Sequence, residues 1–76
     1  MKIDKFGMLF AEVTEYESGV TVLEVYRSVI VSEDGELYAP VRAFLAEHPH
    51  ELISEQEHRD ENYYGNSAVR RLYKLV

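Results

Sequence analysis

Three histidines and four glutamates in the middle of the chain have side chains that could hold a metal ion. They are His48, His50, His58, Glu47, Glu51, Glu55 and Glu57. A zinc site needs three or four such ligands converging tetrahedrally. The His-Pro-His spacing matches no closed site, and there is no cysteine to complete one. Because charged segments of this kind are usually solvated, we expect neither a metal centre nor a cofactor.

Catalytic chemistry has even less support. The serines, histidines and carboxylates lie in no nucleophile elbow or glycine-rich setting. A chain of 76 residues also leaves little room for a pocket that buries a substrate. Paired carboxylates such as Glu55 and Glu57, or Asp60 and Glu61, are more simply the hydrophilic face of a helix. We therefore expect that the protein is not an enzyme.

The net charge of −6 is spread unevenly along the chain. Residues 12–61 hold all but one of the acidic side chains, and only Arg27, Arg42 and Arg59 oppose them. Such a field repels phosphate backbones and anionic lipid and attracts basic surfaces. The cations near the C-terminus (Arg70, Arg71 and Lys74) are therefore expected to be solvated or paired internally. We expect no direct nucleic-acid binding and no membrane binding.

Tyrosine is the commonest aromatic residue, with six copies against three phenylalanines and no tryptophan. Tyr63 and Tyr64 end an almost wholly polar stretch. Adjacent helical residues diverge by about 100°, so the two rings can hardly pack inward together. An exposed tyrosine in an acidic surround is typical of a protein-interface anchor. This pattern predicts a partner-binding surface within residues 47–66, centred on Glu55, Glu57, Asp60, Glu61, Tyr63 and Tyr64.

The elements that would carry this surface begin with the clearest strand of the chain, residues 20–32. It is apolar on both faces, which predicts that it is covered on both or bulged midway. Residues 8–16 alternate as a strand before it, and Gly19 in the connecting loop is free to take positive φ. A register that sets Glu12 opposite Glu24 pairs like charges, so we expect a different one.

The pair Asp34-Gly35 predicts a hairpin turn, because both residues can adopt positive φ. Residues 37–39 would then return as a short third strand, which Pro40 ends because it lacks the N–H for a ladder. These elements predict a three-stranded antiparallel meander over residues 8–39.

Helices are expected in the second half. Residues 40–48 follow Pro40 with apolar residues at helical spacing. Ser54 and Glu57 match a capping box for a polar helix from 55 to about 64. Residues 67–75 fit an amphipathic helix, and a closing strand with Val69, Tyr73 and Leu75 inward is the alternative. The residues expected in the core are Leu23, Val25, Val29, Phe44, Leu45 and Leu72.

The predicted fold is therefore α+β: one small domain over residues 1–76, a three-stranded antiparallel β-meander packed with two or three short helices. The 46% hydrophobic content indicates a folded chain. The absence of cysteine, signal peptide and membrane span favours the cytoplasm.

The predicted function is a non-enzymatic interaction module whose acidic face binds a basic surface of a partner protein, which could itself be a nucleic-acid-binding protein. It would act as an inhibitor or a nucleic-acid-mimicking decoy, of the kind that phages and mobile elements encode; this is an analogy of character. The alternative is a small structural or adaptor subunit that self-associates as a homo-oligomer, for example a homodimer.

Overall fold

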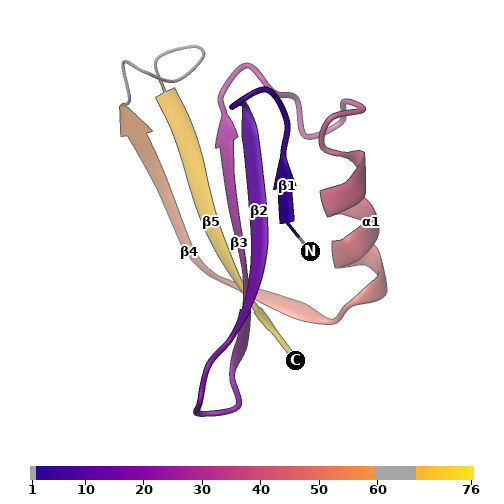
Figure 1. The fold of residues 1–76 in the computed structure, drawn as a ribbon, viewed down its shortest axis with the longest axis vertical. Helices are drawn as coiled ribbons and strands as arrows, with labels where there is room; N and C mark the ends of the chain where they lie inside the picture. Colours follow the sequence, from indigo (N-terminus) through magenta and orange to yellow (C-terminus); the bar gives the residue numbers. More distant parts are fainter. Residues whose placement is uncertain (1, 60–66) are drawn as a thin grey trace.

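The structure is a computed structural model that describes residues 2–59 and 67–76. Within them all strand pairs are antiparallel, and the sheet order is β1-β2-β3-β5-β4 (Figure 1). The elements in chain order are β1 (Lys2–Asp4), β2 (Leu9–Glu15), β3 (Thr21–Ser28), α1 (Ala39–Glu47), β4 (His50–Arg59) and β5 (Ser67–Leu75). The fold is thus α+β as expected, but it is dominated by a five-stranded sheet with one short helix.

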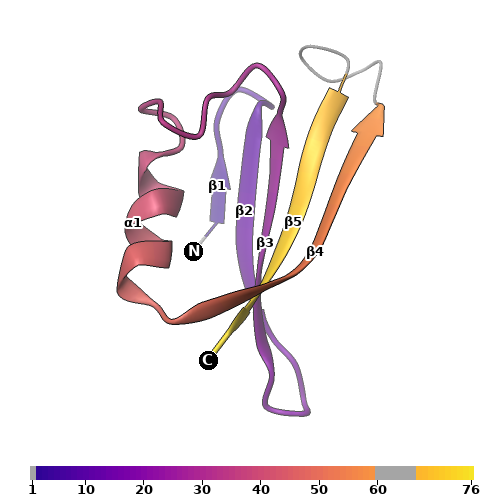
Figure 2. The same cartoon turned by 180° about the vertical axis from the view of Figure 1, so that it is seen from behind.

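One face of the sheet carries the hydrophobic core. Strand alternation places Leu9 of β2, Leu23 and Val25 of β3, and Tyr73 of β5 on this face, and all four side chains are buried. Helix α1 packs against them through the buried Val41. Phe44 and Leu45, which were expected in the core, are partly buried and pack against it. In Figure 2 α1 is nearer to the viewer than β1 and β2 and stands to the left of the strands.

The strand β3 is the centre of the sheet, but it is shorter than the sequence indicates. It ends at Ser28, where Val31 N donates to Ser28 O at 3.0 Å and the chain turns off the sheet. Val31 is buried beyond this turn, whereas Val29 is 39% and Ile30 59% exposed. The expected burial of Val29 is therefore wrong, because its strand ends one residue earlier.

The expected hairpin at Asp34-Gly35 is also wrong. Gly35 has no positive φ, and its N–H donates to Ser32 O at 3.0 Å in a turn that leads toward the helix. Residues 37–39 form no third strand. Tyr38 is buried and precedes α1, which begins at Ala39. The helix predicted over residues 40–48 is confirmed, with Pro40 in its first turn, where the missing N–H leaves no bond unmade.

The second half contains strands where helices were expected. The described part of the polar helix predicted from residue 55 to about 64 belongs to β4, and residues 67–75 form β5, the closing strand that was the alternative. Pairing with β5 along its whole length satisfies the second edge of β3, and it buries Tyr73 and partly buries Val69 and Leu75. Residues 67–75 form a strand because the backbone N–H and C=O groups along the second edge of β3 need partners. The spacing of apolar residues does not reveal this need.

The register between β2 and β3 places Glu12 opposite Glu24, so the expectation that this pair would be avoided is wrong. Cations on either side explain why the pair is tolerated. Arg70 of β5 forms an ion pair with Glu24, and Lys2 of β1 is the register partner of Glu12. Gly19 in the connecting loop has φ 88°, which confirms the positive φ expected there.

Candidate functional site

The predicted partner-binding residues fall partly on β4. Glu55 and Glu57 lie two residues apart on this strand, opposite Arg71 and Val69 of β5, and both are exposed. Their side chains therefore project from the same face, the one that α1 covers elsewhere in the sheet. The other predicted members, Asp60, Glu61, Tyr63 and Tyr64, lie outside the described residues.

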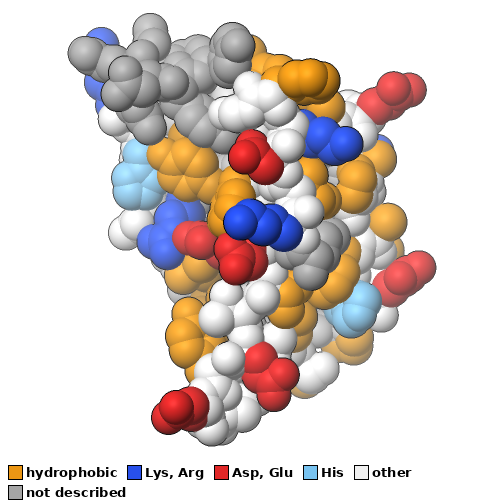
Figure 3. All heavy atoms as spheres, in the orientation of Figure 1, with side chains coloured by type: hydrophobic (Ala, Val, Ile, Leu, Met, Phe, Trp, Pro, Cys, Tyr) orange, Lys and Arg blue, Asp and Glu red, His pale blue; other side chains and the backbone are white. Residues whose placement is uncertain are grey.

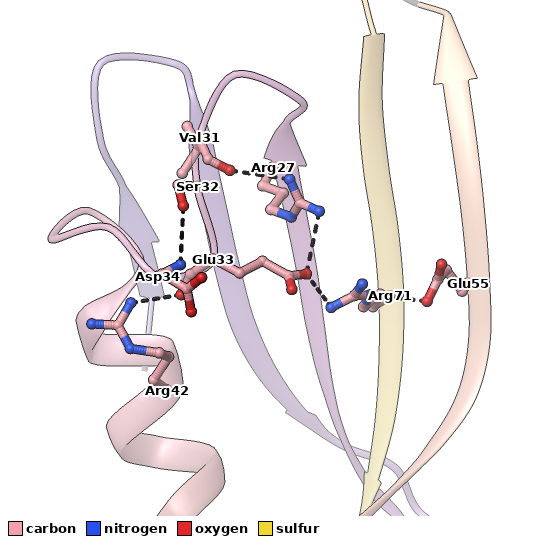
Figure 4. A network of polar contacts seen from close by, with 8 residues as sticks. All are labelled: Arg27, Val31, Ser32, Glu33, Asp34, Arg42, Glu55 and Arg71. Carbon is pink, nitrogen blue, oxygen red and sulfur yellow. Dashed lines mark hydrogen bonds and ion pairs between the residues drawn. The ribbon is translucent and has the colours of Figure 1, made fainter.

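A chain of ion pairs leads from Glu55 into the molecule (Figure 4). Arg71 Nε donates to Glu55 Oε2 at 3.0 Å, and the other end of the same guanidinium pairs with Glu33. Arg27 Nη2 lies 3.2 Å from Glu33 Oε1, the oxygen that also pairs with Arg71. Arg27 Nη1 donates to Val31 O at 3.1 Å. Glu33 thus fastens the loop after β3 to two neighbouring strands.

The helix is joined to this loop by Arg42. Its Nη1 donates to Glu33 O at 2.6 Å and to Gly35 O at 2.7 Å. Because these acceptors are main-chain carbonyls, the Arg42 guanidinium neutralises no carboxylate there. The network therefore has a structural role: it holds the loop before α1 in place.

Two pKa values reflect the surroundings of the network. Burial raises the pKa of Tyr38 to about 12, and the negative potentials of Tyr73 and Glu33 add to the effect while Arg71 opposes it. For Arg71, burial lowers the pKa, but the hydrogen bond and potential of Tyr73, with Glu33 and Glu55, outweigh it and raise the pKa. Arg71 is therefore a fixed positive charge within this network.

The pairing of the C-terminal cations is mostly internal. Arg70 pairs with Glu24, and Arg71 with Glu33 and Glu55, as the sequence predicted, while Lys74 is exposed. In residues 2–59 and 67–76, these three glutamates are the carboxylates that have ion pairs. The remaining carboxylates of the described chain leave a negative potential on its surface.

The strand β4 also displays apolar side chains that the sequence analysis missed. Leu52 is 47% and Ile53 50% exposed, and a register shift between Leu52 and Ser54 marks an irregularity there. No alternation marked β4 as a strand, because it is the edge strand and most of its side chains on both faces are exposed. Alternation of apolar and polar residues arises when one face of a strand is buried and the other is exposed.

The sheet face opposite α1 has no helix over it in the described residues. Tyr26 of β3 stacks with His58 of β4 at a centroid distance of 6.1 Å, and the buried Ala68 of β5 is the register partner of His58. Phe10 lies opposite Tyr26, with Lys2 Nζ 5.8 Å from its ring centroid. Figure 3 looks onto this face and shows acidic and basic side chains meeting near its centre.

The histidines have separate surroundings. His48 Nδ1 lies 2.8 Å from Phe44 O, and His50 Nδ1 lies 2.8 Å from His48 O, so main-chain carbonyls occupy these nitrogens. The third, His58, stacks on Tyr26 instead. No group of three or more His, Asp or Glu side chains is placed to hold a metal ion in the described residues. The same part of the chain contains no pocket.

The single helix within residues 2–59 and 67–76 is too short to cross a membrane. No curated protein and no solved structure is significantly similar to the chain. A family model does match, over residues 2–76, and it covers every described residue. The chain therefore belongs to the Gene product 70 family of phage proteins.

Proposed function

We propose that this phage protein is a non-enzymatic interaction module that binds a basic surface of a partner protein. The binding surface is the acidic part of β4, with Glu55 and Glu57 at its centre. The partner is a protein whose basic surface ordinarily serves another ligand, such as a nucleic acid. The module then acts as an inhibitor or as a nucleic-acid mimic.

The observation that supports this proposal most is the division of charge. The sheet arginines Arg27, Arg70 and Arg71 are held in internal ion pairs, whereas Glu57 on the edge strand has none in the described residues. Glu55 and Glu57 are both exposed and share a face. Residues two apart on a strand are about 6.6–6.8 Å apart, so the unpaired carboxylate of Glu57 lies close to that of Glu55, which Arg71 engages through one oxygen.

The alternative is a structural or adaptor subunit that self-associates. The exposed Leu52 and Ile53 on an uncovered edge strand favour it, since exposed apolar side chains at an edge promote pairing between copies. Light scattering over a range of protein concentrations distinguishes the two. A dimer whose melting depends on concentration supports the subunit, and a monomer throughout supports the module.

The test of the module uses charge reversal and a matched control. The protein is immobilised, nucleic-acid-binding proteins retained from a host lysate are identified, and each is purified. Association and dissociation rates with the partner, and competition with a labelled DNA duplex, are then measured against salt for the wild type, for Glu55→Lys with Glu57→Lys, and for Glu15→Lys with Glu17→Lys. The control pair lies at the β2–β3 turn and changes the net charge equally.

We expect reversal on β4 to lower the association rate and to flatten its salt dependence, because charges near an interface steer the encounter. The control pair should have a smaller effect. Tyr64 belongs to the surface predicted from the sequence; Tyr64→Ala should mainly raise the dissociation rate, and for a hot-spot residue the loss of binding free energy is about 2 kcal/mol. Binding that ignores salt and all of these changes contradicts the proposal and leaves the acidity as a solubility feature.

A further inference from the structure

The outer edge of β4 is long and unoccupied by any described element. In the order β1-β2-β3-β5-β4, β4 is bonded to β5 alone, and both ribbon views show no described element beyond it (Figures 1 and 2). Backbone N–H and C=O groups on the outer side of an edge strand have no partner in their own sheet. The opposite edge is β1, which spans only Lys2–Asp4. The edge that can accept another strand is therefore β4.

The usual protection of an edge strand is incomplete here. Natural edges are shielded by proline, by charged side chains (lysine above all), by a bulge or by a covering element. Residues 50–59 contain no proline and no lysine, and α1 leaves Leu52 and Ile53 about half exposed, at 47% and 50%. The irregularity between Leu52 and Ser54 and the exposed charges of Glu55, Glu57 and Arg59 are the protective features of the described strand. Beyond it, the pairing from Ser54 to Arg59 is regular.

The charges along this regular stretch specify what could pair with it. Directly opposite residues on antiparallel strands have Cβ atoms about 4.5–5.5 Å apart. Glu55, Glu57 and Arg59 share a face, so an added strand would place two of its alternate residues opposite the glutamates and a third opposite Arg59. Glu57 has no ion pair in the described part of the chain, and Glu55 has one oxygen engaged by Arg71. Lysine or arginine opposite them would form favourable cross-strand pairs.

A second copy of the chain fits this edge less well. A two-fold axis at Glu55 or Glu57 sets that residue opposite itself, and an axis at Gln56 sets Glu55 opposite Glu57 of the other copy. Like charges directly opposite one another are destabilising. An axis at His58 sets Glu57 opposite Arg59 of the other copy, which is favourable, but Glu55 then has no partner within the described strand. A basic segment can pair with both glutamates, so charge complementarity favours it over a second β4.

We propose that β4 takes up an extended segment of the partner as an added strand along Ser54–Arg59, with lysine or arginine at alternate positions facing Glu55 and Glu57. This inference rests on the proposed function and specifies how the acidic strand would bind. Main-chain hydrogen bonds give the affinity of such strand addition, and the side chains opposite give its selectivity.

The experiment uses the whole protein and three capped synthetic peptides. The first alternates lysine and valine, the second has glutamate in place of lysine, and the third has the lysine–valine sequence with its backbone N–H groups methylated. Dissociation constants are measured by calorimetry, and amide hydrogen exchange is followed with and without peptide. We expect the first peptide to bind and to slow exchange within residues 54–59, and the other two to bind at least about tenfold more weakly.

Charge reversal places the peptide on the strand. Glu55→Lys with Glu57→Lys should weaken binding of the first peptide by about tenfold, because two cross-strand pairs become repulsive. Glu15→Lys with Glu17→Lys should weaken it much less, although the net charge changes equally. Circular dichroism of both variants confirms that the sheet is retained.

Three outcomes overturn the inference. Equal binding of the methylated and unmethylated basic peptides means general charge attraction without strand addition. Failure of the basic peptide to protect residues 54–59 means that the edge accepts no such strand. Protection that rises with protein concentration in the absence of peptide assigns the edge to a second copy. The first two leave the proposed function to its own competition test, which uses a partner protein and no peptide.

Discussion

Raising the pH from about 9 to about 12 should destabilise the protein through one side chain, Tyr38. Its side chain is only 3% exposed, directly before α1, and it lies in the core cluster with Tyr73. Burial, with the negative potentials of Tyr73 and Glu33, raises the pKa of Tyr38 from 10.0 to about 12. The folded protein therefore keeps this proton over a range in which the unfolded chain has lost it.

The sign and size follow from this difference in pKa. Below pH 10 both states hold the proton, and the stability is fully present. Between pH 10 and about pH 12 only the folded state holds it, so the free energy of unfolding falls as the pH rises. A difference of about two pKa units corresponds to about 2–3 kcal/mol. For a domain with about 5 kcal/mol of stability in total, this is a large fraction.

The assay is urea unfolding at several pH values for the wild type and for Tyr38→Phe. The variant keeps the buried ring and removes its ionisation, so it should lose about 2–3 kcal/mol less than the wild type over this range. Removal of the hydroxyl can also change the stability of the variant at low pH, so the slope of stability against pH is what decides. Parallel pH profiles for the two proteins would refute the reasoning.

Three further predictions concern the fold. Leu23→Ala removes a fully buried side chain and should cost about 2–5 kcal/mol in urea unfolding, and a near-wild-type midpoint would contradict its place in the core. Glu33→Gln removes the carboxylate that joins Arg27 and Arg71; since this carboxylate is 39% exposed, we expect a loss of about 1–2 kcal/mol that shrinks at high salt, and a salt-independent loss would argue against an ionic role. Gly19→Val forces a β-branched residue to φ 88° and should lower the melting temperature more than Gly35→Ala, whose site has no positive φ; the reverse order would show that the loops are assigned wrongly.

The local features of the first half were predictable because their causes lie within a few residues. The strand at residues 9–15, the positive φ of Gly19 and the helix after Pro40 follow from alternation, turn chemistry and the geometry of proline. The hairpin expected at Asp34-Gly35 failed because an Asp-Gly pair permits several turns. No strand follows to make it a hairpin, since Tyr38 leads into α1 instead.

The candidate site was predictable only in part. The excess of carboxylates around Glu55 and Glu57 is visible in the sequence, and both residues are exposed in the structure. Their placement on an edge strand beside Leu52 and Ile53 was not visible, because an edge strand exposed on both faces has no apolar alternation. The capping-box pattern at Ser54 and Glu57 then favoured a helix.

The sequence by itself determined a small, folded, acidic α+β domain whose central strand contains Leu23 and Val25, because composition and alternation follow from burial. Only the tertiary structure decided that residues 67–75 form a strand, since their spacing suits both a helix and a strand. The free edge of β3 made the difference, because its backbone groups need partners. Tertiary neighbours likewise made the pairing of Glu12 with Glu24 tolerable: Arg70 comes from β5, distant in sequence, to neutralise Glu24. The residues adjacent to Glu24 in the sequence do not show that Arg70 will lie beside it.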